Sequence, residues 1–282
     1  MSIEVVDFAD KKAAKLFTDS LLFSGFAVLE NHSVSQALIE ELYAKWYLFF
    51  QSDDKHNFPF DADVHDGFVS TAKSEVAKGN TIKDLKEFYH YYFGGRCPEY
   101  LRELTDNVFN ELSGLARQLL VWVESSLPER IQQKLSVPLT DMIVDSTHTL
   151  FRIIHYPPLD NGMEPGAIRA AAHEDINLLT VLPAASAKGL QLQLGSGEWI
   201  DVPAHPGWMI INVGDMLAEC TDGHFRATSH RVINPTCEYA KQPRVSSPLF
   251  LHPREDVVLS ARYTAGAYRA ERMRELGLAR KA

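Results

Sequence analysis

Two histidines and one aspartate in the second half of the chain have the residue types of a metal site. His173 and Asp175 lie two positions apart, and His230 follows after residues 176–229. Side chains alternate between the two faces of a β-strand, so we expect His173 and Asp175 to project to the same side. The segment before His230 is long enough for several strands and turns to bring this second imidazole close. The sequence therefore predicts a site built from two imidazoles and one carboxylate.

Two histidines and one carboxylate on one face of a metal are typical of non-haem Fe(II) oxygenases, because three coordination positions stay open. Zinc is an alternative metal, although hydrolytic zinc sites are more often rich in histidine and have a general base nearby. The chain has 11 histidines, so chance pairs are expected. Asp222 and His224 form one such competing pair, and the glycine between them indicates a surface hairpin turn.

Size and composition suit one large folded unit. With 282 residues, 45% of them hydrophobic, the chain can bury a sizeable core. A net charge of −9 argues against binding nucleic acid through its phosphates, and no apolar stretch approaches the ~20 residues of a membrane helix. The N-terminus does not resemble a signal peptide, and Cys97, Cys220 and Cys237 have the spacing of free thiols. We expect a cytoplasmic protein that acts on a small molecule, of unknown oligomeric state.

The first half of the chain predicts a mostly helical layer. In residues 35–51 apolar side chains recur every three or four positions, as on one face of a helix. Residues 52–98 are polar and aromatic with scattered glycines, which indicates loop. The other expected elements are strands at 3–7 and 25–30 and helices at 9–23 and 99–126, the last ending before Pro128.

The second half predicts strands. Short β-branched runs bounded by turn residues favour a β-sandwich or barrel of the jelly-roll type. The expected strands are 149–156, 172–182, 189–194, 198–202, 208–213, 225–234 and 244–251, with a turn at Gly214–Asp215 and a last helix at 264–277 that ends at Gly277. We therefore divide the chain into a mostly helical region, 1–148, that is packed on the core without being independent, and a β core with a C-terminal helix, 149–282.

An Arg-x-Ser pair near the end of the β core is a candidate anion site. On a strand, Arg244 and Ser246 face the same way as Pro248 and Phe250. An arginine binds a carboxylate through two parallel N–H bonds, and a neighbouring hydroxyl can donate a further bond. The alternative is an ordinary surface salt bridge. Tyr156 is either a further donor to the same carboxylate or a core tyrosine.

Several segments, in this order along the chain, carry a family resemblance. They are HED at 173–175, GLQL at 189–192, EWIDVPAHPGWMIINVGDML at 198–217, SHRVINP at 229–235 and RVSSPLF at 244–250. Together with VVDF, GFAVLENHSV and DLKEFYHY in the N-terminal half, they resemble the Fe(II)/2-oxoglutarate-dependent dioxygenases, and among them the isopenicillin N synthase-like branch. The match covers most of the chain, and the ordered set is more specific than any single motif.

The resemblance implies a mainly β fold whose double-stranded β-helix, or jelly-roll, core is flanked by N-terminal and C-terminal helices. It implies Fe(II) held by His173, Asp175 and His230, with 2-oxoglutarate as cosubstrate and O2 as oxidant. The implied activity is oxidation of a small organic substrate, by default hydroxylation, with release of succinate and CO2.

The resemblance also implies roles for residues around the metal. Arg244 and Ser246 match the pair that binds the distal carboxylate of 2-oxoglutarate, and Tyr156 matches a tyrosine that contacts the same molecule. Phe250 falls where the family has an aromatic pocket wall, with core packing as its alternative. Arg152 shares strand parity with Tyr156, so it is a candidate anchor for a substrate carboxylate, or else an arginine at the barrel rim paired with an acidic neighbour.

Two departures keep other functions open. Many family members have Asn-Tyr-Tyr-Pro where this chain has Ile-His-Tyr-Pro at 154–157. Isopenicillin N synthase resembles the chain at this point, and it uses no 2-oxoglutarate. The long gap from His230 to Arg244 indicates a small insertion around 238–242. The alternatives are an Fe(II) oxidase of that type, whose Arg/Ser pair binds the substrate carboxylate, and a catalytically silent jelly-roll that binds an anion or a metal. The sequence does not identify the substrate.

Overall fold

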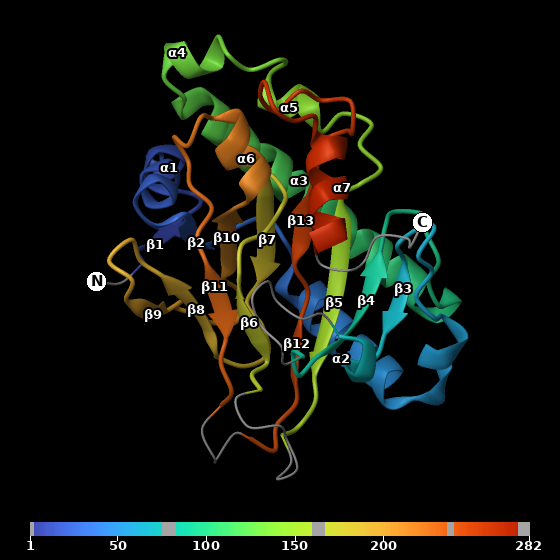
Figure 1. Cartoon of the computed structure of the whole chain (residues 1–282). Helices are drawn as coiled ribbons and strands as arrows, with labels where there is room; N and C mark the ends of the chain where they lie inside the picture. The colour runs from blue at the N-terminus through green and yellow to red at the C-terminus, as the bar shows by residue number, and fades with distance from the viewer. Residues whose placement is uncertain (1–2, 75–82, 160–166, 236–239, 276–282) are drawn as a thin grey trace.

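The computed structural model describes residues 3–74, 83–159, 167–235 and 240–275, which form a large and a small β-sheet with helices packed around them (Figure 1). The N-terminal half contains β1 (Val5–Asp7), α1 (Ala13–Ser24), β2 (Phe26–Glu30), α2 (Gln36–Gln51), η1 (Asp53–Asn57), β3 (Gly67–Val69), η2 (Thr71–Lys73), β4 (Glu87–Tyr91), α3 (Glu99–Ser126), α4 (Glu129–Gln132) and α5 (Leu139–Met142). The C-terminal half contains β5 (Leu150–Tyr156), β6 (Ala170–His173), β7 (Leu179–Pro183), β8 (Leu190–Gln193), β9 (Trp199–Asp201), β10 (Met209–Val213), α6 (Asp215–Cys220), β11 (His230–Val232), β12 (Arg244–Ser246), β13 (Leu249–Leu251) and α7 (Ala265–Glu275).

The two sheets face each other. The large sheet has the order β1-β2-β10-β7-β13-β5-β4-β3, with β12 also paired to β5, and the small sheet has the order β6-β11-β8-β9. Strands β1 and β2 are parallel, and the other pairs are antiparallel. Apolar side chains of both sheets, such as Phe26 and Ile154 on one side and Leu192 and Val232 on the other, form one buried cluster. This is the predicted mainly β jelly-roll architecture.

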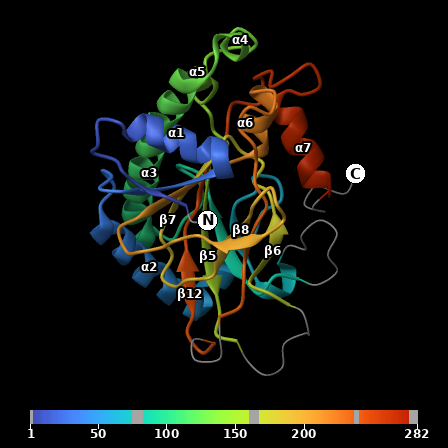
Figure 2. The ribbon, with the colours of Figure 1, turned by 90° about the vertical axis from the view of Figure 1, so that its left-hand side faces the viewer.

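Helices cover the other face of the large sheet. Figure 2 shows α2 and α3 on the left of this sheet, and β6 and β8 of the small sheet on the right. Helix α3 buries a stripe of residues spaced by three and four positions against the strands, which is why its boundaries could be predicted from periodicity. The buried Trp46 of α2 donates from its indole N–H to Thr105 of α3 at 3.1 Å, which fixes the two helices to each other.

Strands from both sides of residue 148 belong to the large sheet. β2 pairs with β10, and β4 pairs with β5. The main hydrophobic core also contains residues from both parts. We therefore propose that 1–148 and 149–282 fold as one cooperative unit, with the boundary at 148 marking a change of architecture.

The prediction of loop over 52–98 was wrong in two places. β3 and β4 lie there and form the far edge of the large sheet. Every residue of β4, with the sequence EFYHY, is buried. A strand covered on both faces lacks the polar–apolar alternation that marks a strand with one exposed face, so its pattern gave no signal.

Two predicted strands and one predicted turn of the β core also differ from the structure. The predicted strand 172–182 is two strands, because β6 ends at His173 and β7 begins at Leu179. The run 244–251 is divided at residues 247–248 into β12 and β13, where Pro248 lacks a backbone N–H. The prediction of a turn between strands at Gly214–Asp215 was wrong, since Asp215 begins helix α6. The predicted helix end at Gly277 lies outside the described residues.

Two expectations from composition are tested in part. Cys97 and Cys220 are buried free thiols, and Cys237 lies outside the described residues. Within the residues that the structure describes, no helix combines the length and the apolar character needed to cross a membrane.

Candidate active site

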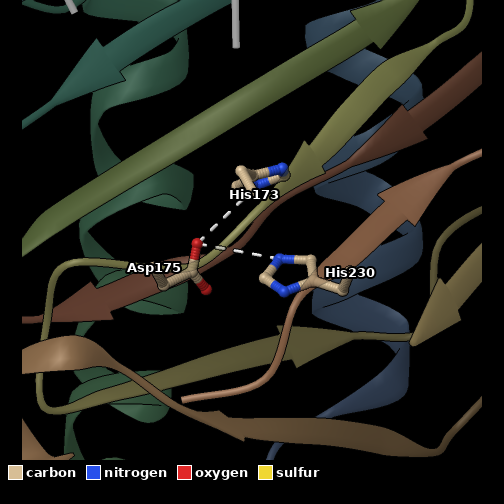
Figure 3. A group of neighbouring side chains, drawn as sticks. All are labelled: His173, Asp175 and His230. Carbon is tan, nitrogen blue, oxygen red and sulfur yellow. Dashed lines mark ion pairs between the residues drawn. The ribbon is translucent and has the colours of Figure 1, made fainter. Parts of the chain in front are cut away.

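His173, Asp175 and His230 point toward one another between the two sheets (Figure 3). Oδ1 of Asp175 lies 3.8 Å from Nε2 of His173 and 3.7 Å from Nε2 of His230. The three ligand atoms lie within 4.8 Å of one another, so one ion can contact all of them. The predicted convergence is present, but the alternation argument for it was wrong. Asp175 lies in the loop after β6, and His173 meets His230 because β6 and β11 pair with these two residues in register.

Both imidazoles are oriented by the main chain. Nδ1 of His173 lies 2.8 Å from the carbonyl oxygen of Ala171, and Nδ1 of His230 lies 3.1 Å from that of Thr228. A carbonyl accepts a hydrogen bond, so each Nδ1 carries the proton and each Nε2 keeps its lone pair for a metal. Removal from water, together with His230, lowers the pKa of His173 to about 4. This imidazole is therefore neutral at neutral pH, which is the form that binds metals.

The carboxylate of Asp175 is held at one oxygen and faces the imidazoles with the other. Oδ2 accepts hydrogen bonds from Thr180 Oγ1 at 2.5 Å and Asn212 Nδ2 at 2.7 Å. Burial alone would raise the pKa of Asp175, but the two imidazoles and these two hydrogen bonds together lower it. The group is thus kept ionised. The sequence analysis missed Thr180 and Asn212, whose only signal is a polar residue inside an apolar strand.

Helix α6 fixes the main chain of the Asp175 loop. The N–H of Asp215 donates to the carbonyl of Asp175 at 2.7 Å, and the N–H groups of Gly214 and Met216 donate to Leu178 and Asn177 at 3.1 Å each. A Cβ on residue 214 would lie 2.2 Å from the carbonyl oxygen of Asn177. Only glycine lets the two segments approach so closely, and this approach sets where Asp175 points.

Glu174, between two members of the triad, turns toward α6. Its carboxyl group interacts with that of Asp215, and Oδ2 of Asp215 accepts a hydrogen bond from the hydroxyl of Tyr268 of α7 at 2.7 Å. Burial and the nearby Asp215 raise the pKa of Glu174, and burial raises the pKa of Asp215 as well. The two carboxyls therefore hold a proton more readily than exposed ones, and they connect the Asp175 loop to α7.

One cavity, which we name the inner cavity, extends between the sheets from the triad. Its lining includes His173, Asp175 and His230 together with Tyr156, Arg244, Ser246, Arg152 and Phe250. Arg244 is 2% exposed, and its guanidinium lies 4.8 Å from the centre of the Tyr156 ring. Its Nε donates to the carbonyl of Ala187 at 3.0 Å, while Nη1 has no hydrogen-bond partner among the described residues. A buried cation with an unpaired N–H is a site for an anion.

A second buried arginine lies behind the first. Arg169 is 1% exposed and lies 5.8 Å from the Tyr156 ring. Its Nη2 donates to the carbonyl of Gln242 at 3.0 Å, and its Nε is unpaired within the described part of the chain. Burial and the nearby Arg244 lower the pKa of Arg169 to about 10, so it stays protonated at neutral pH. Two guanidinium groups therefore make this end of the inner cavity electropositive.

A second cavity, the outer cavity, shares His173 and Asp175 of the triad with the inner cavity and has a volume of about 140 Å³. It is lined by Phe60, His65, Asp84, Lys86, His90, Tyr92, His148, Leu150, Arg152, His173, Glu174, Asp175, Ile176, Phe250, His252, Arg269 and Met273. Arg152 and Phe250 thus line both cavities. The competing pair Asp222 and His224 is in neither, since it lies in a turn after α6 where Asp222 pairs with Lys134 at 2.7 Å.

Comparisons with known proteins agree with this arrangement. The model of the 2OG-Fe(II) oxygenase superfamily matches residues 147–253, which contain the triad and the Arg-x-Ser pair. A solved structure from Shewanella oneidensis, provisionally assigned as an oxygenase, is 48% identical, with a TM-score of 0.89 over 98% of this chain and 99% of that chain.

Curated relatives are more distant. A gibberellin 2-beta-dioxygenase from Phaseolus coccineus is 28% identical over 83% of this chain and 73% of its own length. A 2-oxoglutarate-dependent dioxygenase from Didymella fabae is 25% identical over 75% of this chain and 71% of its own length. With the fold, the triad and these matches in agreement, the chain belongs to the 2OG-Fe(II) oxygenase superfamily.

Proposed function

We propose that His173, Asp175 and His230 hold Fe(II), and that the Arg-x-Ser pair binds the distal carboxylate of 2-oxoglutarate, for the hydroxylation of a small organic substrate. The observation that carries the proposal is the set of side chains that line the inner cavity. It joins three converging ligand atoms to a buried arginine whose Nη1 is unpaired among the described residues.

The residues fit the implied groups. Two imidazoles and a carboxylate are the donor set of a non-haem Fe(II) centre. Arg244, Ser246 and Tyr156 offer N–H and O–H donors to a carboxylate. As a member of this superfamily the protein is a dioxygenase that uses Fe(II), 2-oxoglutarate and O2. When bound, the iron and the keto acid supply a strong oxidant from O2, and succinate and CO2 are released.

The chain supplies placement and protection. Main-chain carbonyls hold the imidazoles, and Thr180 and Asn212 hold the carboxylate, so the ligand geometry exists before any ion arrives. Apolar side chains of both sheets, such as Phe26 and Val232, line part of the inner cavity and limit the contact of the bound groups with water. Because the described cysteines are free thiols, we propose the cytoplasm as its location.

The test is reconstitution under anaerobic conditions with Fe(II) and 2-oxoglutarate, followed by exposure to O2. We expect one iron per chain and formation of succinate, and we expect both to be lost in His173→Ala. The control is His205→Ala, which removes an exposed histidine outside both cavities.

Other outcomes would identify the alternatives. Iron content near zero in the wild-type protein would favour a silent jelly-roll. Bound iron without binding of 2-oxoglutarate would favour an oxidase of the isopenicillin N synthase type, in which Arg244 binds the substrate.

A further inference from the structure

We propose that the primary substrate is an organic anion whose carboxylate binds Arg152, while its apolar body lies in the outer cavity. The inference rests on the proposed function, since it assigns the substrate of the same metal centre. Neither the family match nor the triad requires it, because both concern the iron and the cosubstrate.

Arg152 lies where a substrate must be anchored. It lines both cavities, as do His173 and Asp175 of the triad. A group bound to this arginine is therefore adjacent to the metal ligands, and the rest of the molecule extends into the outer cavity. Arg244, by contrast, lines only the inner cavity.

The guanidinium of Arg152 is held in a fixed plane. Its Nε donates to Nε2 of His90 at 2.8 Å, and Nδ1 of His90 donates to the carbonyl of His65 at 3.1 Å. The rings of Phe88 and Phe250 lie 4.6 and 5.5 Å from its central carbon. A guanidinium has five N–H donors, of which His90 takes one. Arg152 has at least one further interaction, and a bound carboxylate would join these contacts at the terminal nitrogens.

Two of the three acidic side chains that line the outer cavity are already engaged. Asp84 pairs with Lys86 at 2.8 Å, and Asp175 belongs to the triad. Glu174, which also lines the cavity, is exposed, so an entering anion meets one exposed carboxylate among the described lining residues. The anion also meets the cationic side chains of Lys86, Arg152 and Arg269, which favour a negative charge.

Apolar side chains form much of the remaining wall, beside several histidines and Tyr92. The apolar residues are Phe60, Leu150, Ile176, Phe250 and Met273, and they come from segments far apart in the chain. A small polar acid would leave this surface in contact with water. The combination of one oriented cation and an apolar wall instead fits a carboxylic acid with an aromatic or aliphatic body.

The first experiment uses wild-type protein loaded with Mn(II) and 2-oxoglutarate. Phenylacetate, cinnamate and octanoate are titrated calorimetrically, each beside its own primary amide. We expect at least one acid to bind about 10- to 100-fold more tightly than its amide, the range of one charge-assisted hydrogen bond. If no acid of the panel binds more tightly than its amide, the proposal is overturned.

The second experiment asks whether Arg152 is the anchor. Arg152→Gln should bind acid and amide alike, and Arg152→Lys should recover part of the preference, because it keeps the charge without the planar fork. Arg262→Gln, an exposed arginine outside both cavities, is the matched control and should keep the full preference. A preference that survives in Arg152→Gln would contradict the assignment.

Binding of 2-oxoglutarate to the Mn(II)-loaded protein separates the two proposals. If the wild-type protein binds no 2-oxoglutarate, the proposed function fails. If it binds 2-oxoglutarate without discriminating acids from amides, only the substrate proposal fails. A thermal unfolding curve for each variant shows whether lost binding reflects lost structure.

Discussion

The inner and outer cavities share a wall but are built differently. The side chains that we propose to bind an anion in the inner cavity, Arg244, Ser246 and Tyr156, lie on paired strands of the large sheet, and all three are at most 3% exposed. The outer cavity takes side chains from the loop before β3, the β3–β4 edge and helix α7, including Phe60, His90 and Arg269. The proposed cosubstrate site therefore lies on the large sheet, whereas the outer cavity combines residues of that sheet, such as Arg152 of β5, with residues of the surrounding loops and α7.

The difference separates two tasks within one centre. A cosubstrate site that serves every turnover benefits from a wall fixed by strand pairing, because little order must be gained on binding. A wall of helix and loop residues can change without disturbing that core. Variants of the two regions should accordingly have separable effects, and the predictions below test this from the largest effect to the smallest.

Removal of a metal ligand should have the largest effect. Asp175→Ala takes away the carboxylate that both imidazoles face, and we expect turnover to fall by more than about 100-fold, beyond the range seen for outer partners of a metal. The measurements are the iron content of the variant and its rate of succinate formation. Asp222→Ala, at an exposed aspartate, should retain both. Retention of succinate formation in Asp175→Ala would refute the assignment of the triad.

Changes in the inner cavity should act on the cosubstrate. Arg244→Gln removes a buried guanidinium, and we expect the Kd of 2-oxoglutarate to rise about 10- to 100-fold. Titration of the Mn(II)-loaded protein gives the value, with Arg262→Gln as the control. An unchanged Kd for 2-oxoglutarate would mean that Arg244 binds another molecule, as in the oxidase alternative.

The partners of Asp175 should have a moderate effect. In Asn212→Ala one of the two hydrogen bonds to Oδ2 is lost, and we expect metal affinity to fall about 10-fold. Competition with a chelator measures the affinity. Asn57→Ala, at an exposed asparagine of η1, is the control. An affinity for metal equal to that of the wild type in Asn212→Ala would show that Thr180 alone orients the carboxylate.

The last prediction concerns the pH dependence of stability, and involves neither the cosubstrate nor the metal directly. Burial lowers the pKa of His252 from 6.5 to about 4, and its Nδ1 contacts the carbonyl of Phe250 at 3.0 Å. Between these two values the unfolded chain binds a proton that the folded chain does not, so stability falls as the pH drops from 6.5 toward 4. The full difference is about 3 kcal/mol. His252→Asn should flatten the dependence of Tm on pH in this window, and an unaltered slope would contradict the prediction.

Much of the fold followed from local patterns. The amphipathic stripe of α3 and the short β-branched runs after residue 148 gave the layers and the jelly-roll. Strand β4 did not follow, because it is buried on both faces and its aromatic run has no period. The division of 172–182 was equally hidden, since the loop that carries Asp175 is fixed by contacts with α6, which is distant in sequence.

The site was predictable where residue types decide it. His173, Asp175, His230 and the Arg-x-Ser pair could be selected from the sequence because their chemistry is specific. Thr180 and Asn212 could not, because a lone polar residue in an apolar strand does not reveal its partner. The outer cavity was the least predictable part of the site, because its lining residues become neighbours only in the folded protein.

The contact between Gly214 and Asn177 has a consequence for engineering. It fastens the carboxylate loop to α6, and the hydroxyl of Tyr268 fastens α6 to α7, the helix that also presents Arg269 and Met273 to incoming molecules. Exchange of the C-terminal helix for that of a relative, as a way to graft a new selectivity, must therefore preserve this tyrosine. Without Tyr268, α6 would lose its hydrogen bond to α7, and the position of Asp175, which α6 fixes, would be less well defined.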